Sequence, residues 1–189
     1  MYMLNIIDNI LVNDDFNVKY YSIRIESSLF KNPYGIHGVN HAKRVLILCN
    51  CLLYLLDDKN IENKIILSLA SIYHDIGRKY DSNYKSHGKS SWRKIEQLKL
   101  LLDEEDQIKE TVKYIIENHS VDDGETNIET YHIVHRSRAK YLYNIFKDAD
   151  ALDRIRIGDL DTSLLRIKES KNLQNLANYL LYNIDKMNI

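Results

Sequence analysis

The residues best suited to chemistry in this 189-residue chain are histidines on the apolar faces of predicted helices. At about 100° per residue, His41, His74, His87 and His119 align with apolar side chains of four different helices, and Asp75 directly follows His74. Any one of these histidines alone is most simply a hydrogen-bonded core residue. Buried polar groups need partners and buried charges need pairing or a metal ion. The polar atoms of four inward histidines and an adjacent carboxylate therefore find partners most easily if all of them surround one bound cation.

A later predicted helix supplies further carboxylates in the sequence KDADALDR. Relative to the apolar stripe of this helix, Asp153 points inward and Asp150 lies at the edge of the stripe, where a cleft can open. Asp148 is expected to face mostly outward. An alternative without a metal is a set of surface ion pairs, such as Asp150 with Arg154 at i, i+4. The inward histidines elsewhere favour the metal-binding interpretation.

Three segments that contain these residues resemble the H…HD…D signature of the HD-domain superfamily of metal-dependent phosphohydrolases. They are GIHGVNHAKRVLIL around His41, SIYHDIGRKY around His74 and Asp75, and FKDADALDRIR around Asp150. The resemblance covers roughly residues 35–157. It implies an all-α fold, a single-domain helical bundle of the HD-domain type. We assign residues 1–189 to this one domain, with a motif-bearing core at about 35–157 and the terminal helices packed on it.

By resemblance, one divalent metal ion is expected to bind four residues: His41, His74, Asp75 and Asp150. Imidazole with carboxylate suits Mn, Fe, Co, Ni or Zn, and Mg is possible if oxygen ligands dominate. Some HD phosphodiesterases place two further histidines between the doublet and the last aspartate. His87 and His119 lie between the doublet and Asp150 in this sequence. They are candidates for binding a second metal, with Asp75 as the bridge. One and two metals both remain open.

Hydrolysis by metal-activated water is the chemistry that this resemblance implies. A divalent cation lowers the pKa of bound water and polarises a phosphoryl oxygen. Asp75 could orient the attacking water. Cations should surround the phosphate, and Arg44 and Arg78 are the preferred candidates because each lies within one turn of a proposed ligand.

Several other residues have weaker assignments. Asp153 is a candidate partner that orients a ligand or a basic residue. His37, in the turn before the first ligand helix, could contact substrate, but we assign it by default to the surface or a loop, together with His132 and His135. The irregular stretch from Ser120 to His135 could form a lid over the site, since long irregular segments of compact domains are often functional.

Apolar spacing predicts a helical protein, and no strand pattern is found. The expected helices span residues 16–30, 39–57, 61–76, 87–102, 105–119, 137–157 and 171–187, with a short one possible near 4–12. The helix at 171–187 is expected to pack on its own domain, although packing on a second subunit is an alternative. A monomer and a homodimer are both compatible with the sequence.

Composition limits the partners of the protein. With 26 basic and 27 acidic residues the net charge is −1, which argues against a general affinity for nucleic acid or an anionic membrane. The longest apolar stretch, Val45 to Leu56, is too short to span a membrane. We expect a cytoplasmic protein, with Cys49 and Cys51 as reduced packing residues.

Three functions remain in competition. The leading hypothesis is a phosphohydrolase acting on a small phosphorylated substrate, nucleotide-like in character. The cyclic-dinucleotide subgroup has an extended Gly-Tyr-Pro segment that is absent here, which argues against that substrate. The second hypothesis is a non-catalytic metal- or nucleotide-binding regulatory module with the same fold. The third is a di-iron oxygenase of related architecture.

Overall fold

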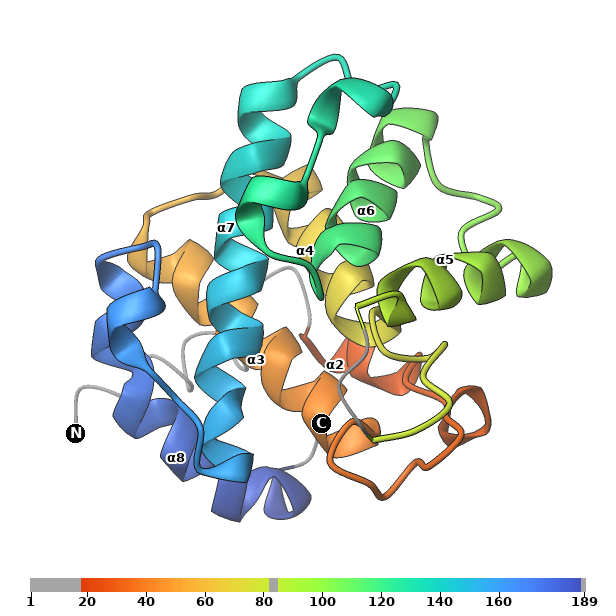
Figure 1. Ribbon diagram of the computed structural model, residues 1–189. Helices are drawn as coiled ribbons and strands as arrows, with labels where there is room; N and C mark the ends of the chain where they lie inside the picture. Colours follow the sequence, from red (N-terminus) through yellow and green to blue (C-terminus); the bar gives the residue numbers. More distant parts are fainter. Residues whose placement is uncertain (1–17, 82–84, 188–189) are drawn as a thin grey trace.

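The helices of the chain form an all-α bundle (Figure 1). The computed structural model describes residues 18–81 and 85–187, and no strand occurs among them. The α-helices are α2 (Val18–Ile23), α3 (Val39–Leu55), α4 (Ile61–Tyr73), α5 (His87–Leu98), α6 (Asp106–Asn118), α7 (Arg136–Leu152) and α8 (Gln174–Asn183). Short 3-10 turns occupy Ser27–Leu29, Asp123–Glu125, Ile128–Thr130, Asp153–Ile157, Thr162–Leu164, Glu169–Leu173 and Ile184–Lys186. Within the two described ranges, no helix combines the length and apolar character that a membrane span requires.

Helix α3 forms the centre of the bundle and is packed against α4, α7, α2 and α8 (Figure 1). From Val45 to Leu53 it is buried on every side, which is typical of a core helix. Cys49 and Cys51 lie in this stretch as free, buried thiols, as predicted. The packing of this buried middle part places the first turn of α3 beside the ends of α4 and α7.

The N-terminal part of the described chain is less helical than predicted. The expected helix at 16–30 is replaced by the short α2 and a separate 3-10 turn. The Ser22 hydroxyl donates to the Lys19 carbonyl at 2.8 Å, a side-chain bond that competes with regular helix structure. The possible helix near 4–12 lies outside the described residues.

Two helices end earlier than predicted because the chain turns into a left-handed backbone conformation. Asp57, just beyond α3, has a φ of 51°, and Lys99, just beyond α5, has a φ of 56°. A left-handed residue stops the helical hydrogen-bond pattern. The helix expected at 137–157 also changes character, since its last five residues form a 3-10 turn.

The prediction that Asp148 faces outward is wrong. Its carboxylate is completely buried and accepts hydrogen bonds from the backbone N–H groups of Arg166 and Ile167, at 3.0 and 2.8 Å, and from the Ser170 hydroxyl at 2.8 Å. The chain after α7 returns across the side of the helix that would otherwise face solvent. A helical wheel describes one helix and cannot show which later segment covers it.

The C-terminal helix α8 contacts the rest of the described chain through its apolar face. Leu176, Ala177 and Leu180 of α8 are buried. They face a layer made by α3 and by the 3-10 turn that follows α7. The end of the chain thus supports the two elements that carry His41 and Asp153.

A glycine permits the close approach of α5 and α6. A Cβ atom at Gly88 would lie 2.2 Å from the carbonyl oxygen of Ile116, far inside van der Waals contact. The same carbonyl accepts a hydrogen bond from Nδ1 of His119 at 2.7 Å. The absence of a side chain at position 88 therefore lets His87, its neighbour, reach His119.

We predict that Gly88→Ala destabilises the fold by about 1–3 kcal/mol, the usual cost of overpacking. Gly124→Ala is the control, because a Cβ there meets no atom within 4 Å, and its effect should stay within about 0.5 kcal/mol. Urea unfolding of both variants measures the difference. Equal stability of Gly88→Ala and the wild type would contradict the packing argument.

Candidate metal centre

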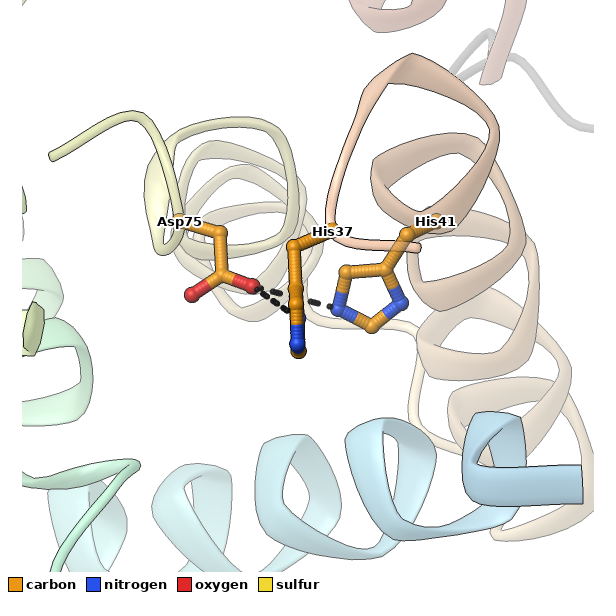
Figure 2. A group of neighbouring side chains, drawn as sticks. All are labelled: His37, His41 and Asp75. Atoms are coloured by element: carbon orange, nitrogen blue, oxygen red, sulfur yellow. Dashed lines mark hydrogen bonds and ion pairs between the residues drawn. The ribbon is translucent and has the colours of Figure 1, made fainter. Parts of the chain in front are cut away.

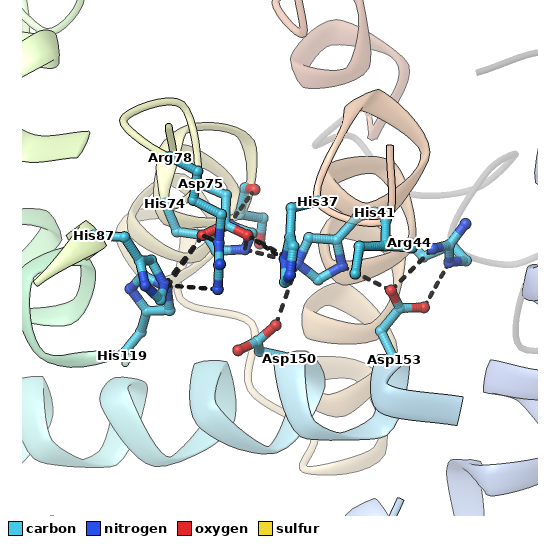
Figure 3. Close-up of polar contacts among 12 residues, drawn as sticks. His37, His41, Arg44, His74, Asp75, Arg78, His87, His119, Asp150 and Asp153 are labelled. Carbon is cyan, nitrogen blue, oxygen red and sulfur yellow. Dashed lines mark hydrogen bonds and ion pairs between the residues drawn. The ribbon is translucent and has the colours of Figure 1, made fainter. Parts of the chain in front are cut away.

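Histidines and aspartates at the ends of five helices converge on one point of the interior (Figure 3). His41 lies in the first turn of α3, and the His74–Asp75 doublet directly follows α4. The other three donors come from the start of α5, the end of α6 and the last turn of α7: His87, His119 and Asp150. All six residues proposed from the sequence as metal ligands are thus brought together.

Four of these residues form a first group of donors. Nε2 of His41 lies 2.9 Å from Nε2 of His74, 3.3 Å from Oδ1 of Asp150 and 3.6 Å from Oδ2 of Asp75. Both histidines are 1% exposed and Asp75 is 4% exposed. This is the set that the H…HD…D resemblance implies.

The remaining two histidines form a second group on the other oxygen of Asp75. Nε2 of His87 lies 2.8 Å from Nε2 of His119. Their distances to Oδ1 of Asp75 are 3.3 and 3.4 Å. One carboxylate therefore lies between the two groups, with Oδ2 toward the first and Oδ1 toward the second.

Hydrogen bonds to backbone carbonyls fix the tautomers of two histidines. Nδ1 of His74 donates to the Ser71 carbonyl at 2.9 Å, and Nδ1 of His119 donates to the Ile116 carbonyl at 2.7 Å. Because a carbonyl can only accept, Nδ1 carries the proton, and Nε2 of a neutral ring presents a lone pair to the centre. Burial lowers the pKa of His74 to about 3, so this ring is neutral at physiological pH.

These lone pairs test whether a cation fits the centre. Nitrogen lone pairs and carboxylate oxygens that face one another in a buried space repel unless a positive charge lies among them. Three sets of donor atoms lie within 4.8 Å of one another: His41, His74 and Asp150; His74, Asp75 and His119; His37, His41 and Asp75. Imidazole nitrogen with carboxylate oxygen is the donor chemistry of divalent transition metals. The residues present therefore fit a metal ion.

The carboxylates of the centre are held in the ionised form. Burial alone would raise the pKa of Asp75, but the histidines around it, His74 first among them, hold it well below its ordinary value. Burial also opposes ionisation of Asp150, and its contact with His41 outweighs that effect. Both aspartates thus offer a full negative charge to a cation.

Asp153 orients His41 through the ring nitrogen that faces away from the centre. Its fully buried carboxylate accepts a hydrogen bond from Nδ1 of His41 at 2.7 Å, which directs Nε2 into the centre. A carboxylate on the distal nitrogen of a ligand histidine fixes the ring and raises its basicity. Burial raises the pKa of Asp153, but His41 and Arg44 outweigh this and leave it lowered.

Arg44 lies in this supporting position. Its Nε and Nη2 donate to Asp153 at 2.5 and 3.0 Å, and the residue is 5% exposed. It does not line the pocket over the donors. This placement favours a role in positioning Asp153 and His41 over the direct contact with phosphate that the sequence suggested.

A pocket of about 240 Å³ opens over the donors and is lined by four basic residues: Arg78, Lys147, Arg154 and Arg156. Arg78 contacts the donors directly: its Nε donates to Oδ1 of Asp75 at 2.9 Å and its Nη2 lies 3.2 Å from Nε2 of His87. Its proposed contact with phosphate stays a prediction. Arg154 pairs with Asp159, so the alternative ion pair with Asp150 is not formed.

The sequence analysis missed two residues of the site. His37 was assigned to the surface by default, yet its Nδ1 lies 2.9 Å from Oδ2 of Asp75 and its side chain is 13% exposed (Figure 2). Arg156 holds it there, with Nη2 3.2 Å from the same nitrogen and Nε donating to the Ile36 carbonyl at 2.7 Å. His37 lies in a turn and Arg156 in a 3-10 segment, where helical periodicity gives no signal.

The irregular stretch after α6 contributes only its first residues to the pocket. Ser120, Val121 and Asp122 line it, whereas His132 and His135 are exposed and do not. The Ser120 hydroxyl donates to the Lys85 carbonyl at 2.8 Å, which ties this rim to the start of α5. Whether the stretch acts as a lid stays a prediction.

The profile of the HD domain family matches residues 38–155, well over half of the chain, and the matched range includes all six donors. The chain belongs to the HD domain family. No curated protein and no solved structure gave a match in the other two comparisons. Membership of the HD domain family supports, at the level of the superfamily, a metal-dependent phosphohydrolase.

The support of His41 by Asp153 gives a prediction. Asp153→Asn should weaken metal binding about 10- to 100-fold, as loss of a carboxylate behind a ligand histidine does. Asp148→Asn is the matched control, since Asp148 is an equally buried aspartate near the same helix end with no donor residue among its partners. Both variants should lose stability, and only the first should lose metal affinity in a titration at a temperature where both are folded. Equal losses of affinity would contradict the role of Asp153.

Proposed function

We propose that this HD-domain protein hydrolyses a phosphate ester of a nucleotide or another small phosphorylated molecule. The observation that supports this most strongly is the placement of the Asp75 carboxylate between two groups of donors, beneath a pocket lined by basic residues. One metal would be held by His41, His74, Asp75 and Asp150. A second would be held by His87, His119 and the other oxygen of Asp75.

A bound divalent metal would supply a hydroxide at neutral pH and stabilise charge on the phosphoryl group. The protein supplies the surroundings for that reaction. Arg78 and Arg156 line the pocket beside Asp75 and would bind the phosphoryl oxygens through charge-assisted hydrogen bonds. The ionised Asp75 would orient the attacking water, as the sequence suggested.

His37 is our candidate for a direct contact with the substrate. Its Nδ1 is occupied by Asp75 and Arg156, and no described residue hydrogen-bonds its Nε2. The ring also lines the pocket. Because burial lowers the pKa of His37, we assign the ring to substrate binding: anchored through one nitrogen, it presents the other to a polar group of the substrate.

The experiment is phosphate release from p-nitrophenyl phosphate and from nucleoside mono- and triphosphates, after reconstitution with Mn²⁺, Co²⁺, Fe²⁺, Zn²⁺ or Mg²⁺. We predict turnover by the wild type and at least ~10²-fold lower kcat for His74→Ala and Asp150→Ala, since a catalytic metal contributes several kcal/mol. His135→Ala, an exposed histidine outside the pocket, should match the wild type.

Two results would contradict the proposal. A metal-loaded wild type that releases no phosphate from any of these substrates would favour the non-catalytic binding module. Metal-dependent consumption of dioxygen with an organic substrate would favour the oxygenase instead.

A further inference from the structure

A groove beside the metal centre extends the site along α5. It consists of two hollows of about 350 and 880 Å³. The first shares His37, Asp75 and Arg78 with the pocket over the donors, and the second shares Lys31, Lys79 and Arg78 with the first. Arg78 lines all three spaces, so the groove adjoins the site of the proposed reaction.

The larger hollow is strongly basic. Among the residues that the structure describes, no acidic residue lines it, and five basic residues do: Lys31, Arg78, Lys79, Arg93 and Lys94. The whole chain carries a net charge of −1. The five basic side chains therefore make a local concentration of positive charge, which favours the binding of an anion, and the carboxylates of the groove, Asp75 and Asp81, line the smaller hollow.

The basic residues of the groove fall into two kinds. Lys94 supports the fold, because its Nζ donates to the carbonyls of Leu29 and Ile76 at 2.5 and 3.3 Å. Lys31 and Arg93 are exposed, and neither forms an ion pair with another described residue. These two side chains line the groove with positive charge that the described part of the chain leaves unneutralised.

We propose that this groove binds a second phosphate group of the substrate, so that the preferred substrates are small molecules with two or more phosphates. The proposal rests on the proposed function and narrows its substrate class. One phosphate would lie at the donors beside Arg78. A further phosphate would lie beyond Arg78, where Lys31 and Arg93 bind it as charge-assisted hydrogen-bond donors.

The distribution of charge favours a small polyphosphate over a nucleic acid. A strand that is cut internally continues on both sides of the reacting phosphate, and each side needs cations. At the rim formed by Ser120, Val121 and Asp122, Lys85 is already paired with Asp122 and Glu125. Unneutralised positive charge lies on the α5 side, which suits a substrate held by one end.

The test is calorimetric titration of the metal-loaded protein with inorganic tripolyphosphate and with orthophosphate, in buffer with excess metal so that chelation is saturated. The wild type should bind tripolyphosphate at least tenfold more tightly. The double variant Lys31→Ala/Arg93→Ala should lose about tenfold of tripolyphosphate affinity and keep its orthophosphate affinity. Lys140→Ala/Lys168→Ala removes the same charge at exposed positions outside the groove, and it should match the wild type.

Three outcomes would overturn the proposal: no preference of the wild type for tripolyphosphate, equal losses in both double variants, or tighter binding of a single-stranded RNA oligonucleotide. In parallel, KM for a nucleoside triphosphate should rise about tenfold in the groove variant while KM for p-nitrophenyl phosphate is unchanged. Absence of turnover would contradict the proposed function alone, because the calorimetric preference does not depend on hydrolysis.

Discussion

The buried, ionised carboxylate of Asp75 is the constraint on which the rest of the site depends. It lies in the interior at the end of α4, where an unpaired charge costs several kcal/mol. The structure surrounds it with imidazoles and one guanidinium, from Arg78. Several of those imidazoles present lone pairs, so the arrangement is complete only with cations among them. The same carboxylate both demands positive charge and joins the two groups of donors.

The fold follows from the need to hold helix ends against this carboxylate. Helices α3 and α4 are apolar on nearly all sides and pack in the centre, which makes their polar ends rigid. Two buried aspartates near the end of α7 then hold neighbouring segments in place by hydrogen bonds. Asp153 holds His41 and Arg44 on one side, and Asp148 fastens the returning C-terminal segment on the other. The donors are thus supported by hydrogen bonds that are themselves buried.

Helical periodicity revealed the residues whose position is set by a regular helix. His41, His87 and Asp150 lie inside helices, and their faces could be read from spacing alone. His37 and Arg156 lie in a turn and a 3-10 segment, where no repeat predicts direction. Asp148 was placed on the wrong face because a later segment covers it, and this depends on the whole fold.

Arg44 shows a further limit of sequence reasoning. The sequence correctly placed Arg44 one turn from His41. Its long flexible side chain, however, can reach either the pocket or the side of His41 that faces away from the pocket. The choice depends on Asp153, a residue 109 positions away. Contacts of this separation are set by the packing of α3 against α7, and the spacing of residues within one helix does not contain them.

The most direct measurement is the metal content of untagged protein by mass spectrometry, for the wild type, His74→Ala and His119→Ala after reconstitution with Mn²⁺ or Fe²⁺. If Asp75 joins two metal sites, the wild type holds close to two equivalents and His119→Ala holds close to one, while His74→Ala loses the first site. A wild type that holds no metal under any of these conditions would contradict the account. A His119→Ala variant with the same content as the wild type would contradict the second site.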